Sequence, residues 1–328
     1  MKKKSLCLFM ALCLLVMGTM RFSVRAHAET QYKVTFYDRQ GKMISPKKLA
    51  DGRNPVPVSA GKKIILESLP GSSKETFMGW SLSPGKTVKP QFCAYYGKPV
   101  RGNLRVYSVT YPLSMEPDLT RITALSKTKY TKAVFVGDSR IVRTKRALVG
   151  QKGLAPARVE YIAMSNYDLR LYRMNLEAKL IASVKKDNKK SGPPIAVVFA
   201  LGVNDLKHMD ERGEARAVAR EYAAYLKKLA GKLKKYNVSL FFMSVNPVNS
   251  SQILEYKKKY GASTSMRYEF LIRAFNEEIT GLMPSPWKYM DTYKWLLNNG
   301  YSMVDGVHFT PKTCKRILDY SIKFLNKA

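Results

Sequence analysis

The sequence predicts an α/β fold with a doubly wound, parallel five-stranded sheet, preceded by a small all-β domain. From about residue 132 to the C-terminus, apolar runs alternate with amphipathic segments, which is typical of a parallel sheet covered by helices. From about residue 30 to 113, short alternating runs are broken by glycine and proline, and no helical period is visible. We therefore expect a β domain over 29–113 and an α/β domain over 114–328.

The larger domain is predicted to contain five strands and several helices. Four strands are continuous apolar runs, which suit parallel strands buried on both faces, and the fifth is weaker. They are 133–136, 159–164, 195–201, 239–245 and 287–290. Apolar residues at helical spacing predict helices over 218–233, 270–279 and 317–324. Functional residues of such sheets gather at the carboxyl ends of the strands.

The smaller domain is predicted to contain strands at 32–38, 62–69, 76–81 and 104–111. The order of Val34-Thr35-Phe36-Tyr37-Asp38, Gly41-Lys42, Phe77-Met78-Gly79-Trp80 and Leu104-Arg105-Val106-Tyr107 resembles small β repeats of Gram-positive surface proteins. That resemblance implies a stalk or adhesive unit, and a plain spacer is the alternative. We expect Tyr32, Phe36 and Trp80 to be core residues rather than a platform for sugars.

The first 28 residues have the pattern of a signal peptide. Lys2, Lys3 and Lys4 precede an apolar run over 6–17 that is too short to span a bilayer, and Ala26-His27-Ala28 matches a cleavage site. We expect a secreted, extracellular protein associated with the cell wall, with a retained N-terminal anchor as the alternative. No later stretch of the sequence is long and apolar enough to be predicted as a transmembrane segment.

The charge of the chain indicates which kinds of partner it attracts. The formal net charge is +33, and basic residues are spread along the chain in pairs, which predicts a cationic surface that attracts polyanions. Outside a cell these are anionic cell-wall polymers and lipid surfaces, and charge alone does not predict a specific nucleic-acid partner.

Removal of the signal leaves Cys93 and Cys314, which excludes a disulfide-rich scaffold and leaves their pairing open.

Three loops carry residues suited to acyl transfer. They are Gly137-Asp138-Ser139 after the first strand, Gly202-Val203-Asn204-Asp205 after the third, and Asp305-Gly306-Val307-His308 before the last helix. A serine becomes a nucleophile when a base takes its proton and a third group orients that base. Ser139 is therefore the candidate nucleophile, with His308 as its base and Asp305 as the orienting carboxylate.

The same loops offer donors for an oxyanion. Ser139 is expected to start a helix and present its N–H, Asn204 offers a side-chain amide, and Gly202 lets backbone approach closely. Arg140 can bind an anionic substrate, or it can pair with a local carboxylate or backbone carbonyl. His208 is expected to be a loop residue. No cluster of His, Cys and acids has metal-ligand spacing, so neither a metal nor another cofactor is predicted.

This combination of loops resembles the SGNH hydrolase superfamily, also called GDSL esterases. The resemblance implies that Ser139 is the nucleophile, Asn204 the oxyanion-hole asparagine, and Asp305 and His308 the Asp-x-x-His pair. Residues 135–140 and Val245-Asn246-Pro247 are similar to a secreted Gram-positive subgroup. The expected activity is removal of O-acyl or O-acetyl groups from a wall glycan or a small ester. An O-acyltransferase and a catalytically impaired surface-binding protein are the alternatives.

One block departs from the family pattern. The family's second block usually supplies a glycine whose N–H completes the oxyanion hole, whereas this chain has Ala163-Met164-Ser165-Asn166-Tyr167 after the second strand. Ser165 or Asn166 can still donate a backbone N–H, and we assign this role to Ser165. Because one oxyanion donor is worth on the order of 10²–10³ in rate, loss of this donor would leave weak activity or none.

Overall fold

The computed structural model describes residues 30–328 with several gaps. These gaps are 50–51, 63, 66–68, 70–74, 86–94, 97–98, 113–115, 127–128, 149–157 and 262–264. The predicted signal peptide and Cys93 lie outside the described residues. Among the described helices, none combines the length and apolar composition needed to cross a bilayer.

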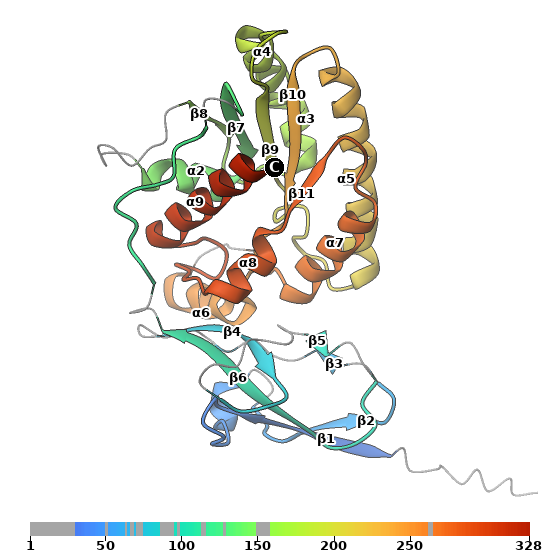
Figure 1. Ribbon diagram of the computed structural model, residues 1–328. Coiled ribbons are helices and arrows are strands. Elements are labelled where there is room, and N and C mark those ends of the chain that lie inside the picture. The colour runs from blue at the N-terminus through green and yellow to red at the C-terminus, as the bar shows by residue number, and fades with distance from the viewer. Residues whose placement is uncertain are drawn as a thin grey trace, which may run out of the picture. The chain divides into compact units, whose positions relative to one another are not determined.

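The central sheet has five parallel strands in the order β11-β10-β9-β7-β8 (Figure 1). Its strands are β7 (Lys132–Gly137), β8 (Val159–Ala163), β9 (Ile195–Ala200), β10 (Val238–Met243) and β11 (Lys288–Met290). All five coincide with the predicted apolar runs, so the predicted fold class is confirmed. The chain goes from β7 outward to β8 and then crosses to the other side of β7, to β9. This order opens a crevice between the carboxyl ends of β7 and β9, where ligands bind in such folds.

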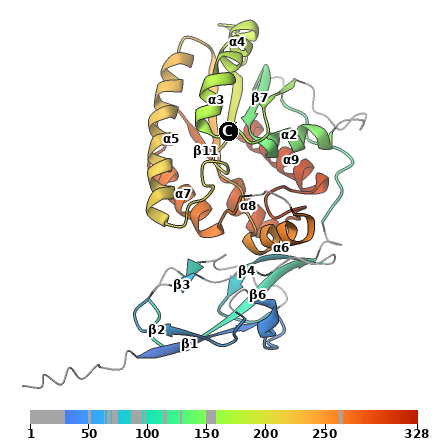
Figure 2. The same cartoon turned by 180° about the vertical axis from the view of Figure 1, so that it is seen from behind.

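Helices cover both faces of this sheet (Figures 1 and 2). They are α2 (Ser139–Ala147), α3 (Leu169–Asn175), α4 (Glu177–Asp187), α5 (Arg212–Leu233), α6 (Ser250–Tyr260), α7 (Glu269–Gly281), α8 (Thr292–Asn299) and α9 (Pro311–Lys327). Successive strand residues face opposite sides, so Phe199 packs with α3, α5 and α7 while Val198 packs with α2 and α9. The two faces thus form two separate apolar cores.

The predicted helices are parts of α5, α7 and α9, whereas α3, α4, α6 and α8 were not predicted. All four are only 7 to 11 residues long, and three of them, α3, α6 and α8, begin at side-chain caps. Asp168, Asn249 and Asp291 each accept a hydrogen bond from a backbone N–H in the first turn. Such Asp and Asn caps are the sequence signal that could have found these helices.

The N-terminal sheet has four strands in the order β2-β1-β6-β4. They are β1 (Gln31–Tyr37), β2 (Val56–Ser59), β4 (Glu75–Ser81) and β6 (Leu104–Pro112). A separate two-stranded pair is formed by β3 (Ile64–Ile65) and β5 (Tyr95–Tyr96). Trp80 is fully buried, with its ring 5.0 Å from Phe36 and 5.2 Å from Phe77. Phe36 and Trp80 are therefore core residues as expected, and Tyr32 packs against this core while partly exposed.

The cysteine of the α/β part is buried. Cys314 lies in α9 as a free thiol, 2% exposed. Burial raises the pKa of this thiol to about 11, so it stays protonated at neutral pH. Its surroundings are those of a core residue.

Candidate active site

Ser139 lies on a tight turn between β7 and α2. It is the first residue of α2, and Asp138 is the N-cap, accepting a hydrogen bond of 2.9 Å from the N–H of Arg140. A Cβ at Gly137 would lie 2.3 Å from a side-chain carbon of Ile141, so the turn requires glycine. The N–H of Ser139 has no carbonyl partner within its own helix and lies at the positive end of the helix dipole.

The three residues predicted for catalysis meet at the carboxyl end of β7. His308 Nε2 is 2.9 Å from Ser139 Oγ, and His308 Nδ1 is 2.7 Å from Asp305 Oδ2. Ser139 is 8% exposed and Asp305 is 6% exposed, while the His308 side chain is 20% exposed. The predicted nucleophile, base and orienting carboxylate are therefore hydrogen-bonded in series.

The charge of Asp305 sets the tautomer of His308. Burial by itself would raise the pKa of Asp305, but hydrogen bonds from the His308 ring and from the backbone N–H groups of His308 and Val307 lower it to about 2. An ionised carboxylate only accepts hydrogen bonds, so Nδ1 of His308 must carry the proton. Nε2 is then free to accept the proton of Ser139.

A tight turn over residues 305–308 places the Asp305 carboxylate beside the His308 ring. Asp305 Oδ1 accepts N–H bonds from Val307 (3.0 Å) and His308 (2.7 Å), and Gly306 turns the chain at a φ of 81°. A Cβ at Gly306 would lie 2.4 Å from the carbonyl oxygen of Asn249, so glycine is required for both reasons. The pair is thereby prearranged within its own loop.

Glu116 holds together the segments on either side of this loop. Its carboxylate accepts hydrogen bonds from the hydroxyls of Ser302 and Thr313. It also forms an ion pair with Arg316 at 3.1 Å. Ser302 Oγ also lies 2.6 Å from Thr310 Oγ1, so the two ends of the loop are joined. Glu116 is distant in sequence from these partners, and no sequence pattern indicated this role.

Arg140 connects the loop of His308 to a neighbouring loop. It is 8% exposed and donates from Nε to Val307 O, and from Nη1 and Nη2 to the carbonyls of Asn246 and Pro247. Its guanidinium lies 5.1 Å from the Phe309 ring centroid. Of the two roles considered for Arg140, binding to backbone carbonyls is the one observed.

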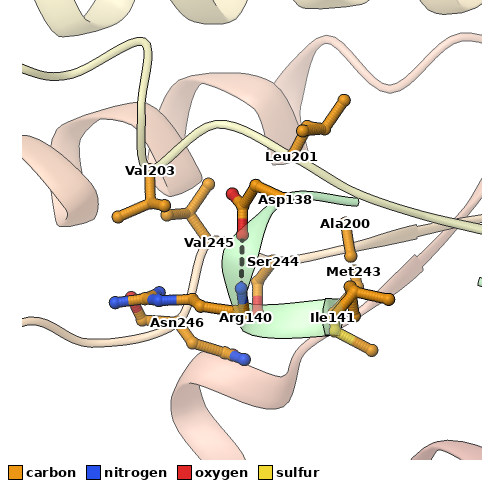
Figure 3. Close-up of a pocket in the computed structure, with 10 residues that line it drawn as sticks. All are labelled: Asp138, Arg140, Ile141, Ala200, Leu201, Val203, Met243, Ser244, Val245 and Asn246. Carbon is orange, nitrogen blue, oxygen red and sulfur yellow. Dashed lines mark hydrogen bonds between the residues drawn. The ribbon is translucent and has the colours of Figure 1, made fainter. Parts of the chain in front are cut away.

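A small cavity lies beside Arg140 (Figure 3). Its volume is about 20 Å³, which is room for a single water molecule. It is lined by Asp138, Arg140, Ile141, Ala200, Leu201, Val203, Met243, Ser244, Val245 and Asn246. Because neither Ser139 nor His308 is in this lining, the cavity is not where the reacting ester would lie.

Asn204 is held with its amide in one orientation. Its Oδ1 accepts a bond of 2.7 Å from Arg267 Nη2, and its Nδ2 donates to Tyr167 O at 2.9 Å. Since a guanidinium has only donors, the oxygen must face Arg267, and the second N–H of the amide has no partner among the described residues and can bind a ligand. Arg267 is 5% exposed and also donates to the carbonyls of Val203 and Ser265. No sequence pattern indicated this role of Arg267.

The remaining predicted donors are placed as follows. Gly202 has a φ of 132°, and a Cβ there would lie 2.5 Å from a methyl of Val245, which explains the glycine. Ser165 is exposed in a turn where Asn166 takes a left-handed φ of 65°. Asparagine tolerates this conformation better than most residues, so the turn forms without glycine. Among the described residues, no hydrogen bond links Ser165 to Ser139 or Asn204, and its role stays a prediction.

The other histidine of the described chain lies in a loop, as expected. His208 is exposed in the turn after Asn204, at a φ of 59°. Asp205 is half-buried and accepts hydrogen bonds from Tyr222 and Leu169, which tie this loop to α5 and α3. In the part of the chain that the structure describes, no group of three His, Cys or acidic residues could hold a metal ion.

Comparisons with known proteins give only distant similarity. No family model and no curated protein matches the sequence. A protein from Slackia heliotrinireducens, provisionally described as an SGNH hydrolase, is similar with a TM-score of 0.42 and 12% identity, over 61% of this chain and 100% of that one. A member of the lipolytic G-D-S-L family from Veillonella parvula is similar with a TM-score of 0.38 and 10% identity, over 58% and 96%.

A third solved structure is the C-terminal catalytic domain of Streptococcus pneumoniae peptidoglycan O-acetyltransferase A, with a methylsulfonyl adduct. The similarity has a TM-score of 0.36 and 14% identity, over 61% of this chain and 94% of that domain. Similarity at this level carries no argument about activity. The chemistry of the site is therefore argued from the residues of this chain.

Proposed function

We propose that this protein is a secreted serine ester hydrolase that removes O-acyl or O-acetyl groups from a cell-wall or surface glycan. The observation that carries the proposal is the hydrogen-bonded series from Ser139 Oγ through His308 to Asp305. Ser139 and Asp305 are buried and His308 is partly exposed, and Asn204 lies on the loop after β9, the strand beside β7. These are the parts that acyl transfer requires.

In the first half of the reaction, Ser139 Oγ attacks the carbonyl carbon of the ester while its proton passes to His308 Nε2. The carbonyl π electrons move to oxygen, and a tetrahedral intermediate forms. The imidazolium is stabilised by the Asp305 carboxylate. Collapse of the intermediate breaks the bond to the alcohol oxygen, which takes the proton from His308 and leaves the acyl group on Ser139.

In the second half, water replaces the alcohol. His308 takes a proton from water, the hydroxyl oxygen attacks the acyl carbon, and the proton returns to Ser139 Oγ as the acid leaves. The oxyanion of each intermediate is assigned to the N–H of Ser139, the free N–H of Asn204 and the second-block N–H at Ser165. Such donors are effective because they are fixed before the charge develops.

The choice of a surface glycan as substrate rests on the setting of the chain. The N-terminal segment has the pattern of an export signal, and the net charge of +33 favours anionic surroundings. The resemblance of the β domain to surface repeats supports the same location. The acyl chain and the sugar follow from none of these features, so the substrate is tested directly.

The first experiment labels the active serine. Purified protein is incubated with a fluorophosphonate probe beside the Ser139→Ala variant, with Ser165→Ala as a matched control. We expect labelling of the wild type and the control, because Ser165 contributes only a backbone N–H, and none of Ser139→Ala. A folded wild type that is not labelled would favour the impaired binding protein.

The second experiment identifies the reaction. O-acetylated wall glycan is incubated with the enzyme, and free acetate and acetylated acceptor sugars are both measured. Release of acetate supports the hydrolase, and transfer of acetyl groups to an added glycan acceptor identifies the acyltransferase. Labelling of Ser139 without release or transfer of acetate would reject the proposed substrate while leaving the site intact.

A further inference from the structure

Two lysine-rich segments meet at the amino ends of β9 and β10. One is the end of α4 with the loop to β9, and the other is the end of α5 with the loop to β10. Asn237 joins them, because its N–H donates to Asn188 Oδ1 at 2.7 Å and its side-chain amide donates to the carbonyls of Lys189 and Gly192. The two segments therefore form one surface, named here the basic end.

The charge of the basic end is exposed and not neutralised. Its exposed lysines are Lys185, Lys186, Lys189, Lys190, Lys227, Lys228, Lys234 and Lys235. The nearby acids are paired with other lysines: Glu177, the first residue of α4, binds Lys232 in the last turn of α5, and Asp187 binds Lys132. Within the described residues, none of the eight lysines forms an ion pair. A charged helix end is most often only a solvated surface, so further features are needed to indicate a ligand.

A cleft at the basic end supplies such a feature. Its volume is about 500 Å³, within the range of sites for small ligands, and it is lined by Thr131, Lys132, Arg158, Lys186, Asp187, Asn188 and Lys189. Two of its cations are fixed in place. Lys132 holds the carboxylates of Glu160 and Asp187, and Arg158 donates to the carbonyls of Tyr130 and Leu125. Because Lys132 is shared by two carboxylates, these three groups together keep one negative charge, and the positive charge of the lining comes from Arg158, Lys186 and Lys189.

This cleft is remote from the catalytic serine. The basic end precedes β9 and β10, whereas Ser139 and Asn204 follow β7 and β9. A parallel strand of 6 residues such as β9 is about 20 Å long, so the two sites lie at opposite edges of the sheet. In Figure 1 the end of α4 marks the basic end at the top of the sheet. A ligand here would not occupy the reaction site.

We propose that the basic end binds a flexible polyanion with phosphodiester repeats, one repeat entering the cleft and its neighbours contacting the surrounding lysines. Lysine is a compact, hydrated point charge that suits phosphates held at variable angles, whereas arginine suits fixed planar recognition. Sites for single-stranded nucleic acid add exposed aromatic rings on which bases stack. At the basic end, Tyr236 is only half-buried and is covered by Lys235, 5.3 Å from its ring. This binding does not depend on the proposed esterase activity.

The test measures binding of fluorescent poly(glycerol phosphate) by anisotropy over a range of salt concentrations. Lys186, Lys189 and Lys190 are replaced together by glutamine, and the control replaces the three consecutive lysines Lys257, Lys258 and Lys259 at the end of α6 in the same way. We expect the first variant to bind about tenfold more weakly or worse at low salt, with a log–log salt slope smaller by about 2, because three phosphate contacts are lost. The control should bind almost like the wild type.

Three results would overturn the proposal. The first is no binding by the folded wild-type protein at low salt. The second is an equal loss in the control, because net charge alone would then explain binding. The third is equal or tighter binding of duplex DNA of the same charge through the same lysines, which would identify a nucleic-acid surface. Hydrolysis of a small soluble ester is measured in parallel, so that failure of the esterase proposal is seen separately.

Discussion

Positive charge has opposite roles at the two ends of the parallel strands. These ends are called here the carboxyl edge and the amino edge of the sheet. At the carboxyl edge, Arg140 and Arg267 are buried, and each guanidinium donates three hydrogen bonds to oxygens of neighbouring loops. At the amino edge, the lysines of the basic end are exposed and have no carboxylate partner among the described residues. A buried cation must have all its donors satisfied, so it orders the chain around it. An exposed cation contributes little to stability but adds to a long-range potential.

The largest predicted effects concern the proposed catalytic series Ser139–His308–Asp305 at the carboxyl edge. We expect Ser139→Ala to lower kcat for ester hydrolysis by on the order of 10⁴- to 10⁶-fold, and Asp305→Asn by about 10⁴-fold, because His308 would lose its orienting acceptor. Stopped assays with a chromogenic ester measure both. Both variants should keep the wild-type circular dichroism, since His308 and the Arg140 bonds remain. Activity of Ser139→Ala within tenfold of the wild type would reject Ser139 as the nucleophile.

The next effect tests whether Arg267 acts through Asn204. Asn204→Ala should lower kcat by about 10²- to 10³-fold, and Arg267→Met should lower it somewhat less, with little change in KM, because the amide is no longer oriented. If the guanidinium acts through the amide, the double variant should be no worse than Asn204→Ala. Arg267→Lys should restore part of kcat.

The matched control for this cycle is Arg216→Met on the exposed surface of α5, where the arginine lies 3.8 Å from Glu278. It should leave kcat unchanged. All variants are assayed at a temperature at which they are folded, because Arg267→Met leaves two buried carbonyls unsatisfied. A double variant that loses the product of both single effects would show that Arg267 and Asn204 act independently.

A buried acid at the carboxyl edge should make stability depend on pH. Glu269 accepts a hydrogen bond from the N–H of Val248 at 2.7 Å, and burial raises its pKa from 4.5 to about 7. A carboxyl with a raised pKa in the folded state is neutral there while it is ionised in the unfolded chain. Its contribution to stability is therefore present below pH 4.5 and is lost as the pH rises to 7.

Relative to Glu269→Gln, the wild type should lose about 3 kcal/mol of unfolding free energy between pH 4.5 and pH 7. Urea unfolding of both proteins across this range measures the difference, and the value at pH 4.5 serves as the internal reference. Glutamine keeps the acceptor for Val248, so the variant should fold. Parallel curves over the whole range would contradict the assignment of a raised pKa to Glu269.

The smallest effects are expected at the amino edge. Replacement of Lys186, Lys189 and Lys190 by glutamine should change the unfolding free energy by no more than about 0.5 kcal/mol and leave hydrolysis of a small ester unchanged. Urea unfolding and the chromogenic assay test this. A loss of several kcal/mol would mean that these lysines hold structure, and the contrast between the two edges would fail.

Much of the candidate site was predictable because several of its residues come directly after predicted strands in the sequence. Continuous apolar runs identified the five parallel strands, and the carboxyl ends of β7 and β9 then located Ser139 and Asn204. Asp305 and His308 were found because they are three residues apart in one loop. The supporting residues were not found. Arg267 contacts Asn204, 63 positions away, and Glu116 contacts Ser302, 186 positions away, and nothing near them in sequence indicates those partners.

The sequence by itself determined which groups are available for chemistry, since residue type and local spacing identify the candidate nucleophile at a strand end and the candidate base in the loop before the last helix. It also determined the net charge. Only the tertiary structure decided how these groups are oriented and where the charge is used. The orientation of the Asn204 amide depends on a guanidinium from a distant segment, and the basic end exists because Asn237 joins two loops. Packing brings such partners together, and local sequence does not encode distances between residues that are far apart in the chain.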